Sequence, residues 1–156
     1  MADVEKNSES FILFEVAGTT YALPSRSVQQ MEMVEHITPV PNAPFFVEGV
    51  VFLRGQVVPA VNLRRRFGFE RKPRDLKTRL VVVAHNGRTV GLVVDAAREF
   101  VSIPSSAIQL PPEAITGLSG KYLQSIAKLG DRLILIIDVN EVLNFTEFTT
   151  PAPTTA

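Results

Sequence analysis

The two halves of the sequence carry the same order of structural signals, and this repeat limits the folds open to the chain. Displaced by 69 residues, the apolar run 11–16 falls on 80–85, and the turn residue Gly18 falls on Gly87. Each run is followed by a short polar turn and a second apolar run, as in a β-hairpin. The Asn-Gly pair at 86–87 favours a type I′ turn. Each half is therefore predicted to begin with a hairpin.

A second hairpin follows in each half. Displaced by 75 residues, the turn at Gly55 falls on the turn at Gly130. One residue further out of register, Asn62 falls on Asp138, and both side chains suit the N-cap of a short helix. Each half thus has a hairpin, an irregular bridge, a second hairpin and a capped helical turn, an order that favours duplication over chance.

The number of short strands sets the predicted architecture. Four or five strands in each half are too few for a sandwich but enough for a small closed barrel, which leaves few exposed edges. The strands show little polar alternation, which fits barrels packed on each other as well as around their own cores. We predict an all-β chain with short helices, built as two barrels side by side. The first should take mainly residues 17–79 and the second mainly 80–145, with strand 11–16 shared between them.

The remaining segments are predicted from their polar residues and prolines. Residues 1–10 are polar with mixed charge and 146–156 lack apolar content, so both are expected to be disordered tails around one domain, 11–145. Residues 69–78 and 105–121 are expected to be loops. The N-terminus has no basic region before an apolar core, so no signal peptide is expected there.

The segment after Pro24 has two interpretations. Val28, Met31 and Val34 recur at helical spacing, which predicts a short helix or an irregular segment from Ser27 to Met33. That spacing usually marks a core stripe, but some of these side chains, with Val28 the best candidate, would instead be exposed for a partner.

The segment Gly49–Leu63 is predicted to be a hairpin with two almost wholly apolar arms. Its turn is placed at Gly55-Gln56, because glycine at the first central position suits a type II′ turn. Arg54 lies at the tip, where it either faces water, pairs with an internal carboxylate or contacts a partner. In the second half Leu129 falls on Arg54, so the hairpin is duplicated and the arginine is not.

Composition excludes several classes of function. Sixteen basic residues balance sixteen acidic ones, which argues against nucleic acid as the main ligand. No cysteine is present, so disulfides and thiolate chemistry are excluded. No apolar run approaches the roughly 20 residues of a membrane-spanning helix. These features predict a cytoplasmic protein with no direct membrane insertion.

The residues needed for catalysis are missing. His36 and His85 stand alone without metal-ligand spacing, no serine nucleophile motif occurs, and the acidic residues are scattered. We therefore expect no enzyme, no catalytic residue, no metal and no cofactor. One alternative from a different class is a barrel that binds or transforms a small ligand between its halves, which would require a polar, titratable pocket.

Basic residues gather after the second hairpin. Arg64, Arg65 and Arg66 are followed by further cations and opposed only by two acids in the loop. A solvated helix and loop would explain this composition, and electrostatic steering toward an acidic partner is the alternative. The further cations are Arg71, Lys72, Arg74 and Lys77, and the acids are Glu70 and Asp75.

These segments resemble the CheW family of bacterial chemotaxis adaptors over about residues 10–146. The run Gly-Val-x-x-Leu-Arg-Gly-x-x-x-Pro is fairly specific to that family. The segments that carry the resemblance are 11–16, 21–23, 37–44, 47–55 with Pro59 and 62–63, 90–95, and 130–143.

The resemblance implies a fold and a function. CheW-like proteins have two five-stranded SH3-like barrels and couple chemoreceptor cytoplasmic tips to a CheA-type histidine kinase through its regulatory domain, helping to assemble signalling arrays. The alternative is a CheW-like adaptor of a motility or developmental pathway. The resemblance places partner contacts at Arg54, Gly55, Leu53, Gly49, Val28 and Gln30.

Three positions depart from the family pattern. Gln30 stands where a glutamate is common, so the resemblance predicts no acidic partner for Arg54 at that position. Phe52 stands where asparagine is common, and Asn62 where aspartate is common.

Overall fold

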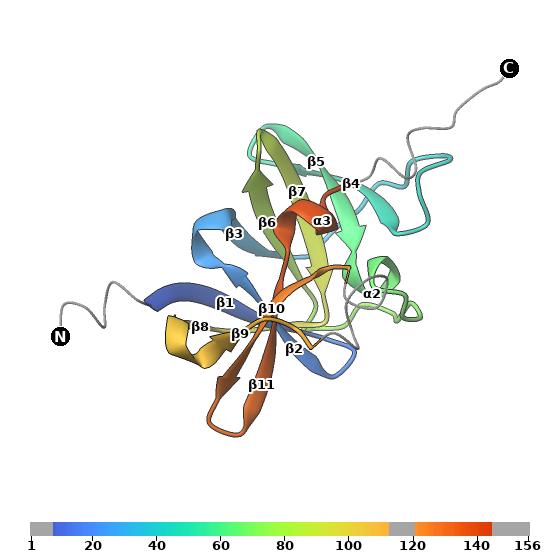
Figure 1. Cartoon of the computed structure of the whole chain (residues 1–156). Coiled ribbons are helices and arrows are strands. Elements are labelled where there is room, and N and C mark those ends of the chain that lie inside the picture. The colour runs from blue at the N-terminus through green and yellow to red at the C-terminus, as the bar shows by residue number, and fades with distance from the viewer. Residues whose placement is uncertain (1–7, 113–120, 145–156) are drawn as a thin grey trace, which may run out of the picture.

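The computed structural model describes residues 8–112 and 121–144, and most of them lie in two β-sheets (Figure 1). One sheet has six strands in the order β8-β1-β2-β11-β10-β9, and the other has five in the order β3-β6-β7-β5-β4. The strands are β1 (Ser8–Val16), β2 (Thr19–Pro24), β3 (Val28–Met33), β4 (Val47–Leu53), β5 (Gln56–Asn62), β6 (Arg79–His85), β7 (Arg88–Val94), β8 (Ala96–Pro104), β9 (Ile108–Gln109), β10 (Leu123–Leu129) and β11 (Arg132–Ile137).

Helices in the described residues are short. They are the 3-10 turns η1 (Ser25–Ser27) and η2 (Ser105–Ala107) and the single-turn helices α2 (Leu63–Arg66) and α3 (Val139–Val142). None of them is long and apolar enough to cross a membrane. The all-β class with short helices and two small barrels is therefore confirmed.

Three apolar clusters form the core, one within each barrel and one between the barrels. One lies inside the barrel formed by the six-stranded sheet and includes Leu13 and Ile134. A second lies inside the barrel formed by the five-stranded sheet and includes Val58 and Val82. The third joins the two sheets, with Phe14 from one and residues of the other. Strand β6 shows why its sequence lacks polar alternation. Leu80 and Val82 face their own barrel, while Val81 and Val83 face the neighbouring one.

The sheets divide the chain differently from the predicted halves 17–79 and 80–145. Strand β2 pairs with the C-terminal strand β11, and β1 lies between β2 and β8; Figure 1 shows the blue β1 and β2 beside the orange β10 and β11. Strands β6 and β7 belong to the five-stranded sheet with β3, β4 and β5. The prediction failed because the chain crosses between sheets after β2 and again after β7. As a result, each sheet contains one parallel pair of strands, β11 with β2 in the six-stranded sheet and β5 with β7 in the five-stranded sheet.

The turn of the β4–β5 hairpin lies one residue earlier than predicted. Leu53 pairs with Gln56, so the two turn residues are Arg54 and Gly55, with φ of 48° and 79°. Positive φ at both central residues defines a type I′ turn, so the predicted type II′ turn at Gly55-Gln56 is wrong. The Asn86-Gly87 turn is type I′ as predicted, with φ of 52° and 78°.

The corrected turn brings the second hairpin and its N-cap into one register. A single displacement of 76 residues relates Leu53 to Leu129 and Asn62 to Asp138. The structural equivalent of Arg54 is therefore Gly130, the first residue of the β10–β11 turn, and not Leu129. The arginine remains without a counterpart. Both predicted N-caps are confirmed, since Asn62 accepts a hydrogen bond from a backbone amide and Asp138 does the same.

The segment Ser27–Met33, predicted to be a short helix or irregular, is a strand from Val28 onward, and Ser27 ends η1. β3 pairs with β6, and the register shifts between Val28 and Gln30. This bulge brings Val28 and Met31 to the same side, against the cluster between the barrels, although side chains three apart on a regular strand face opposite sides. The spacing that predicts a helix therefore arises from a bulged strand.

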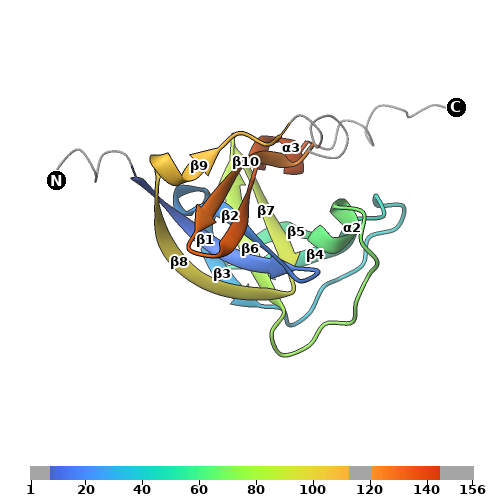
Figure 2. The same cartoon turned by 60° about the horizontal axis from the view of Figure 1, so that its bottom comes forward.

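Two further expectations need correction. Residues 8–10, predicted to belong to a disordered tail, form the start of β1 and pair with β8. The predicted loop 105–121 contains η2 and the short strand β9. Residues 1–7, 113–120 and 145–156, including the predicted C-terminal tail 146–156, lie outside the described residues. The predicted loop 69–78 is confirmed, and Figure 2 shows that it extends outward from α2 before the chain enters β6.

Candidate partner-binding surface

The tip of the β4–β5 hairpin presents Arg54 to solvent. Its side chain makes no hydrogen bond or ion pair with any residue that the structure describes. Its φ of 48° is the left-handed conformation, which costs an ordinary L-residue roughly 1–2 kcal/mol. Asparagine, aspartate and glycine are the residues that a type I′ turn favours at this position. The chain therefore keeps an arginine where the turn itself would be more stable without one.

Apolar side chains surround this arginine. Phe52 and Val57 are cross-strand partners on the two arms and are 72% and 60% exposed. Met33, at the end of β3, is 59% exposed. Leu53 lines a groove of about 460 Å³ between the end of β3 and β4, together with Met33 and Phe52. We call Met33, Phe52, Leu53, Arg54 and Val57 the hairpin surface.

Gly49 supports this surface from inside the barrel. A Cβ atom on Gly49 would lie 2.1 Å from the carbonyl oxygen of Thr38, and its φ of 147° is unfavourable for other residues. Thr38 and Val50 exchange two backbone hydrogen bonds of 2.8 Å across this point. The register of β4 and β5 shifts between Val47 and Gly49, so Gly49 lies at a β-bulge. The segment that approaches is the chain's own.

The other predicted contact residues lie elsewhere. Leu53, Arg54 and Gly55 meet at the hairpin tip, whereas Val28 and Gln30 lie on β3, the opposite edge strand of the same sheet. Val28 is half-buried against the cluster between the barrels, and Gln30 is half-buried beside β6. Only Leu53, Arg54 and Gly55 are therefore adjacent, at the hairpin tip, while Val28, Gln30 and Gly49 lie along the two edge strands.

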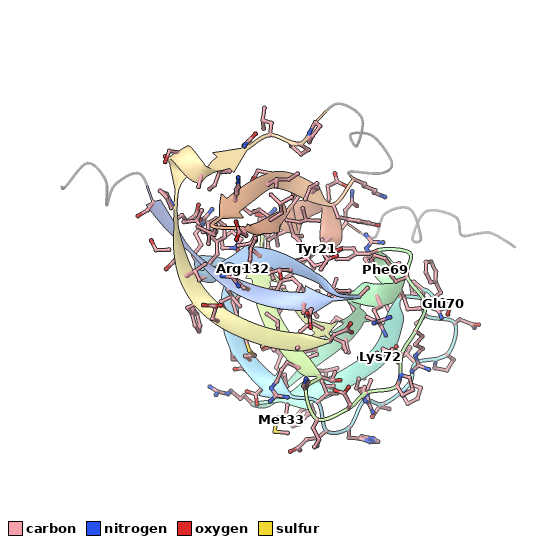
Figure 3. The ribbon with its side chains drawn as sticks, turned by 90° about the horizontal axis from the view of Figure 1, so that it is seen from below. Tyr21, Met33, Phe69, Glu70, Lys72 and Arg132 are labelled. Atoms are coloured by element: carbon pink, nitrogen blue, oxygen red, sulfur yellow. The ribbon has the colours of Figure 1, made fainter. Side chains whose placement is uncertain are left out.

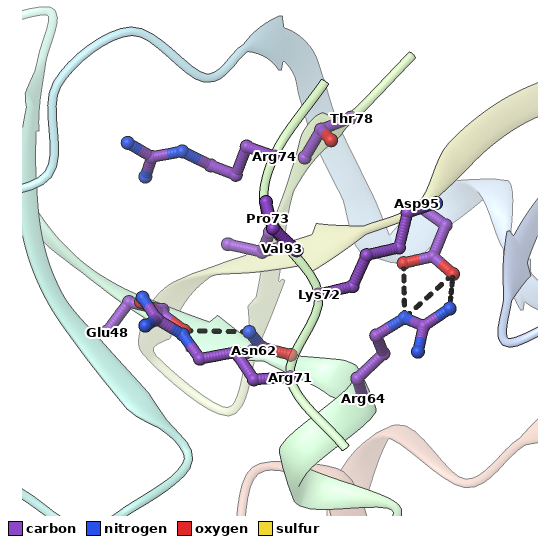
Figure 4. Close-up of a pocket in the computed structure, with 10 residues that line it drawn as sticks. All are labelled: Glu48, Asn62, Arg64, Arg71, Lys72, Pro73, Arg74, Thr78, Val93 and Asp95. Atoms are coloured by element: carbon purple, nitrogen blue, oxygen red, sulfur yellow. Dashed lines mark hydrogen bonds and ion pairs between the residues drawn. The ribbon is translucent and has the colours of Figure 1, made fainter. Parts of the chain in front are cut away.

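A polar hollow of about 480 Å³ lies under the loop 69–78 (Figure 4), and no sequence pattern predicts its position. On one side Asp95 accepts two hydrogen bonds from Arg64 Nε, both 3.0 Å. On the other side Glu48 accepts hydrogen bonds from Arg71 and, at 2.7 Å, from the amide of Asn62. These partners are 14 to 31 residues apart, so local sequence patterns do not reveal them.

The environment of Glu48 changes its pKa. Burial alone would raise the pKa of this carboxyl. Hydrogen bonds from Arg71 and Asn62, together with the positive charges of Arg71 and Arg74, outweigh burial and lower the pKa. Asp75 also has a lowered pKa, caused first by the hydrogen bond from the backbone amide of Lys77. Both acids are thus held in their charged forms, which suits fastening the loop 69–78 to the barrel.

The junction between the barrels is apolar. The hollow found there is small, about 170 Å³, and its lining is aromatic and aliphatic, with Tyr21 and Phe67 among its residues. Burial raises the pKa of Tyr21. Within residues 8–112 and 121–144, no group of three or more His, Cys, Asp or Glu is placed to hold a metal ion. This lining counts against the hypothesis of a small-ligand or catalytic barrel, which requires a polar, titratable pocket.

Similarity to known proteins agrees with this architecture. Residues 10–147 match the family described as the CheW-like domain. The chain is 32% identical to the chemotaxis protein CheW of Bacillus subtilis, covering 89% of each, and 29% identical to that of Klebsiella aerogenes, covering 92% of this chain and 86% of the relative. The crystal structure of the scaffolding protein TtCheW from Thermoanaerobacter tengcongensis matches with a TM-score of 0.78 and 32% identity, covering 83% of this chain and 88% of that one.

Two small β-barrels with an exposed hairpin surface and an apolar junction are the architecture of a binding module. The chain belongs to the CheW family, whose family match spans nearly all of the described residues. It is an adaptor of the chemotaxis type, and the SH3-like form predicted for its barrels agrees with the structure of TtCheW.

Proposed function

We propose that this chain couples the cytoplasmic tip of a methyl-accepting chemoreceptor to the regulatory domain of a CheA-type histidine kinase. The observation that carries the proposal is Arg54, an exposed arginine held in a left-handed turn and flanked by exposed apolar side chains. A protein keeps a locally unfavourable residue where function requires it. The protein would work in the cytoplasm and be recruited to receptor arrays at the membrane.

The composition of the hairpin surface supports a protein partner. Arginine and aromatic residues are enriched at the energetic centres of interfaces, and a guanidinium makes several hydrogen bonds in one plane. Phe52 and Val57 supply apolar area on both sides of Arg54. An acidic group of the partner would find the arginine already free of internal bonds to described residues.

A coupling protein needs a second contact region, and β3 supplies a candidate. Val28 and Gln30 lie on β3, at the other end of the strand order from β4, and offer a second partner a contact region distinct from Arg54. Holding both partners in one complex lets the receptor's conformation bias the kinase, because each partner binds one state of the complex better than another. No chemical step by this chain is required.

Reconstitution with receptor-bearing membranes and kinase tests the proposal. The chain should co-sediment with both, and Arg54→Asn should reduce kinase recruitment about tenfold while the variant stays folded, since the turn itself favours asparagine. Lys128→Glu is the control, because this exposed residue lies on β10 in the other sheet. Failure of the unchanged protein to join the complex would refute the proposed function.

A non-chemotaxis signalling pathway is the second candidate. The named relatives are called chemotaxis proteins, which favours a chemotaxis partner. Pull-down from the native cytoplasm distinguishes the two, because the receptor and kinase recovered with the chain identify the pathway that it serves.

A further inference from the structure

The hollow under the loop 69–78 is separate from the hairpin surface. Its walls come from β4, β5, α2 and the end of β7, with the loop itself as the outer wall. Asn62 and Thr78, both almost fully buried, form part of its floor. Figure 4 shows the loop residues Arg71, Lys72 and Arg74 spread along this hollow.

The fixed charges of the hollow do not cancel. Four cations line it against two carboxylates, Glu48 and Asp95. Each carboxylate is already bound by one guanidinium, which leaves Lys72 and Arg74 as the excess positive charge.

Neither of these two cations is firmly held. Lys72 Nζ lies 3.6 Å from Asp75, and both side chains are nearly half exposed, an arrangement that contributes little in water. Arg74 makes no hydrogen bond or ion pair with the residues of the described ranges. Its guanidinium therefore has its donors free for an incoming acceptor.

We propose that this hollow is a docking site for an acidic segment of a partner protein. Carboxylates of the segment would bind Arg74 and Lys72 and displace the weak contact between Lys72 and Asp75. The paired residues Arg64 with Asp95 and Arg71 with Glu48 would hold the loop in place as the segment binds. This third surface adds to the proposed coupling role and does not depend on it.

An acidic chain fits the hollow better than a small anion does. The volume of about 480 Å³ exceeds what one compact ion fills, and the free cations are spread along a loop. Glu48 and Asp95 would also repel a compact dianion such as phosphate, because its charge is concentrated in one place. Single carboxylates spaced along a peptide reach Lys72 and Arg74 separately and avoid this repulsion.

A peptide titration tests the docking site without kinase or receptor. The probe is a short peptide in which glutamate alternates with alanine, and the matched peptide has glutamine at each glutamate. Backbone amide shifts of the labelled protein should move at residues 71–78, apart from Pro73, and at Glu48 with the glutamate peptide only. The affinity should fall as salt rises, because the contacts are exposed.

Matched charge reversals localise the effect. Lys72→Glu with Arg74→Glu should weaken the glutamate peptide about tenfold or more, as expected for the loss of two exposed charge contacts. Lys128→Glu with Arg132→Glu makes the same change in net charge on the β10–β11 hairpin, and Figure 3 shows Arg132 well apart from Lys72. This control should leave the affinity unchanged.

Three outcomes would overturn the docking site. They are equal binding of the glutamate and glutamine peptides, equal weakening by the control reversal, and movement of the same amides by inorganic phosphate but not by the peptide. The last result would identify a small-anion site instead. Because the assay lacks receptor and kinase, each of these results leaves the proposed coupling function standing.

Discussion

Arg66 Nε donates a hydrogen bond of 3.1 Å to the carbonyl oxygen of Val142, so α2 holds the C-terminal end of α3. The Nη2 atom of Arg66 also donates to Asn144 O, at 2.6 Å. The guanidinium lies over the ring of Phe46, 4.3 Å from its centroid. The last carbonyls of a helix have no partner within it, and here a buried arginine from the other half of the chain satisfies them.

We expect Arg66→Met to destabilise the protein by about 3 kcal/mol. The methionine would fill space but leave buried carbonyls of the α3 end without donors. Arg65→Met is the control, because Arg65 is only partly buried and its backbone amide, not its side chain, is bound by Asn62. Urea denaturation measures both. Similar losses for the two variants would show that Arg66 contributes only bulk.

Gly49→Ala should cost more than about 3 kcal/mol, because the new Cβ atom would lie 2.1 Å from Thr38 O and the backbone would have to shift. Gly68→Ala is the matched control. Gly68 also has positive φ, but nothing lies within 4 Å of its Cβ position, so about 1–2 kcal/mol is expected. Thermal unfolding compares them, and equal losses would mean that φ alone and not the approach of Thr38 determines the cost.

Arg54→Asn should stabilise the isolated protein by about 0.5–1 kcal/mol. Asparagine adopts the left-handed conformation of this turn at lower cost than arginine does. Arg54→Gly should act in the same direction. Denaturation in the absence of partners measures the change, and a loss of stability in both variants would reveal an internal role for the arginine.

Acid should weaken the contribution of Glu48 to stability. Its pKa is lowered in the folded protein, so its contribution is complete above the ordinary value of about 4.5 and is lost as pH falls through the folded value. We expect the protein to be more stable than Glu48→Gln near neutrality and the difference to shrink below about pH 4.5. Urea denaturation across this range measures it. A constant difference would mean that shape and not charge at residue 48 matters.

Local signals in the sequence predicted the hairpins and caps well. The Asn86-Gly87 turn and both N-caps depend on residues next to each other in the chain, so their chemistry is visible there. The Arg54-Gly55 turn was misplaced by one residue because glycine suits the second position of a type I′ turn as well as the first of a type II′ turn. Only the pairing of Leu53 with Gln56 separates the two.

Non-local arrangements were beyond the sequence patterns. Strands β1 and β6 look alike in composition, and nothing in either shows which sheet it will join. The charge run at Arg71–Arg74 was visible, but not the approach of Glu48 or the hollow between them. The exposure of Phe52 and Val57 also depends on which arm faces outward, and the almost wholly apolar arms do not indicate it.

The six-stranded sheet takes its strands from both ends of the chain, and the five-stranded sheet takes its strands from the middle. Cleavage of one peptide bond therefore cannot separate the two barrels. Cleavage between β5 and β6 would leave the first fragment with β1 and β2 but without β8 and β11, their neighbours in the sheet, and would deprive β5 of β7. Each fragment would carry unpaired edges, which invite aggregation. The two barrels therefore depend on each other for their strand pairings, and we expect the chain to unfold in one cooperative transition.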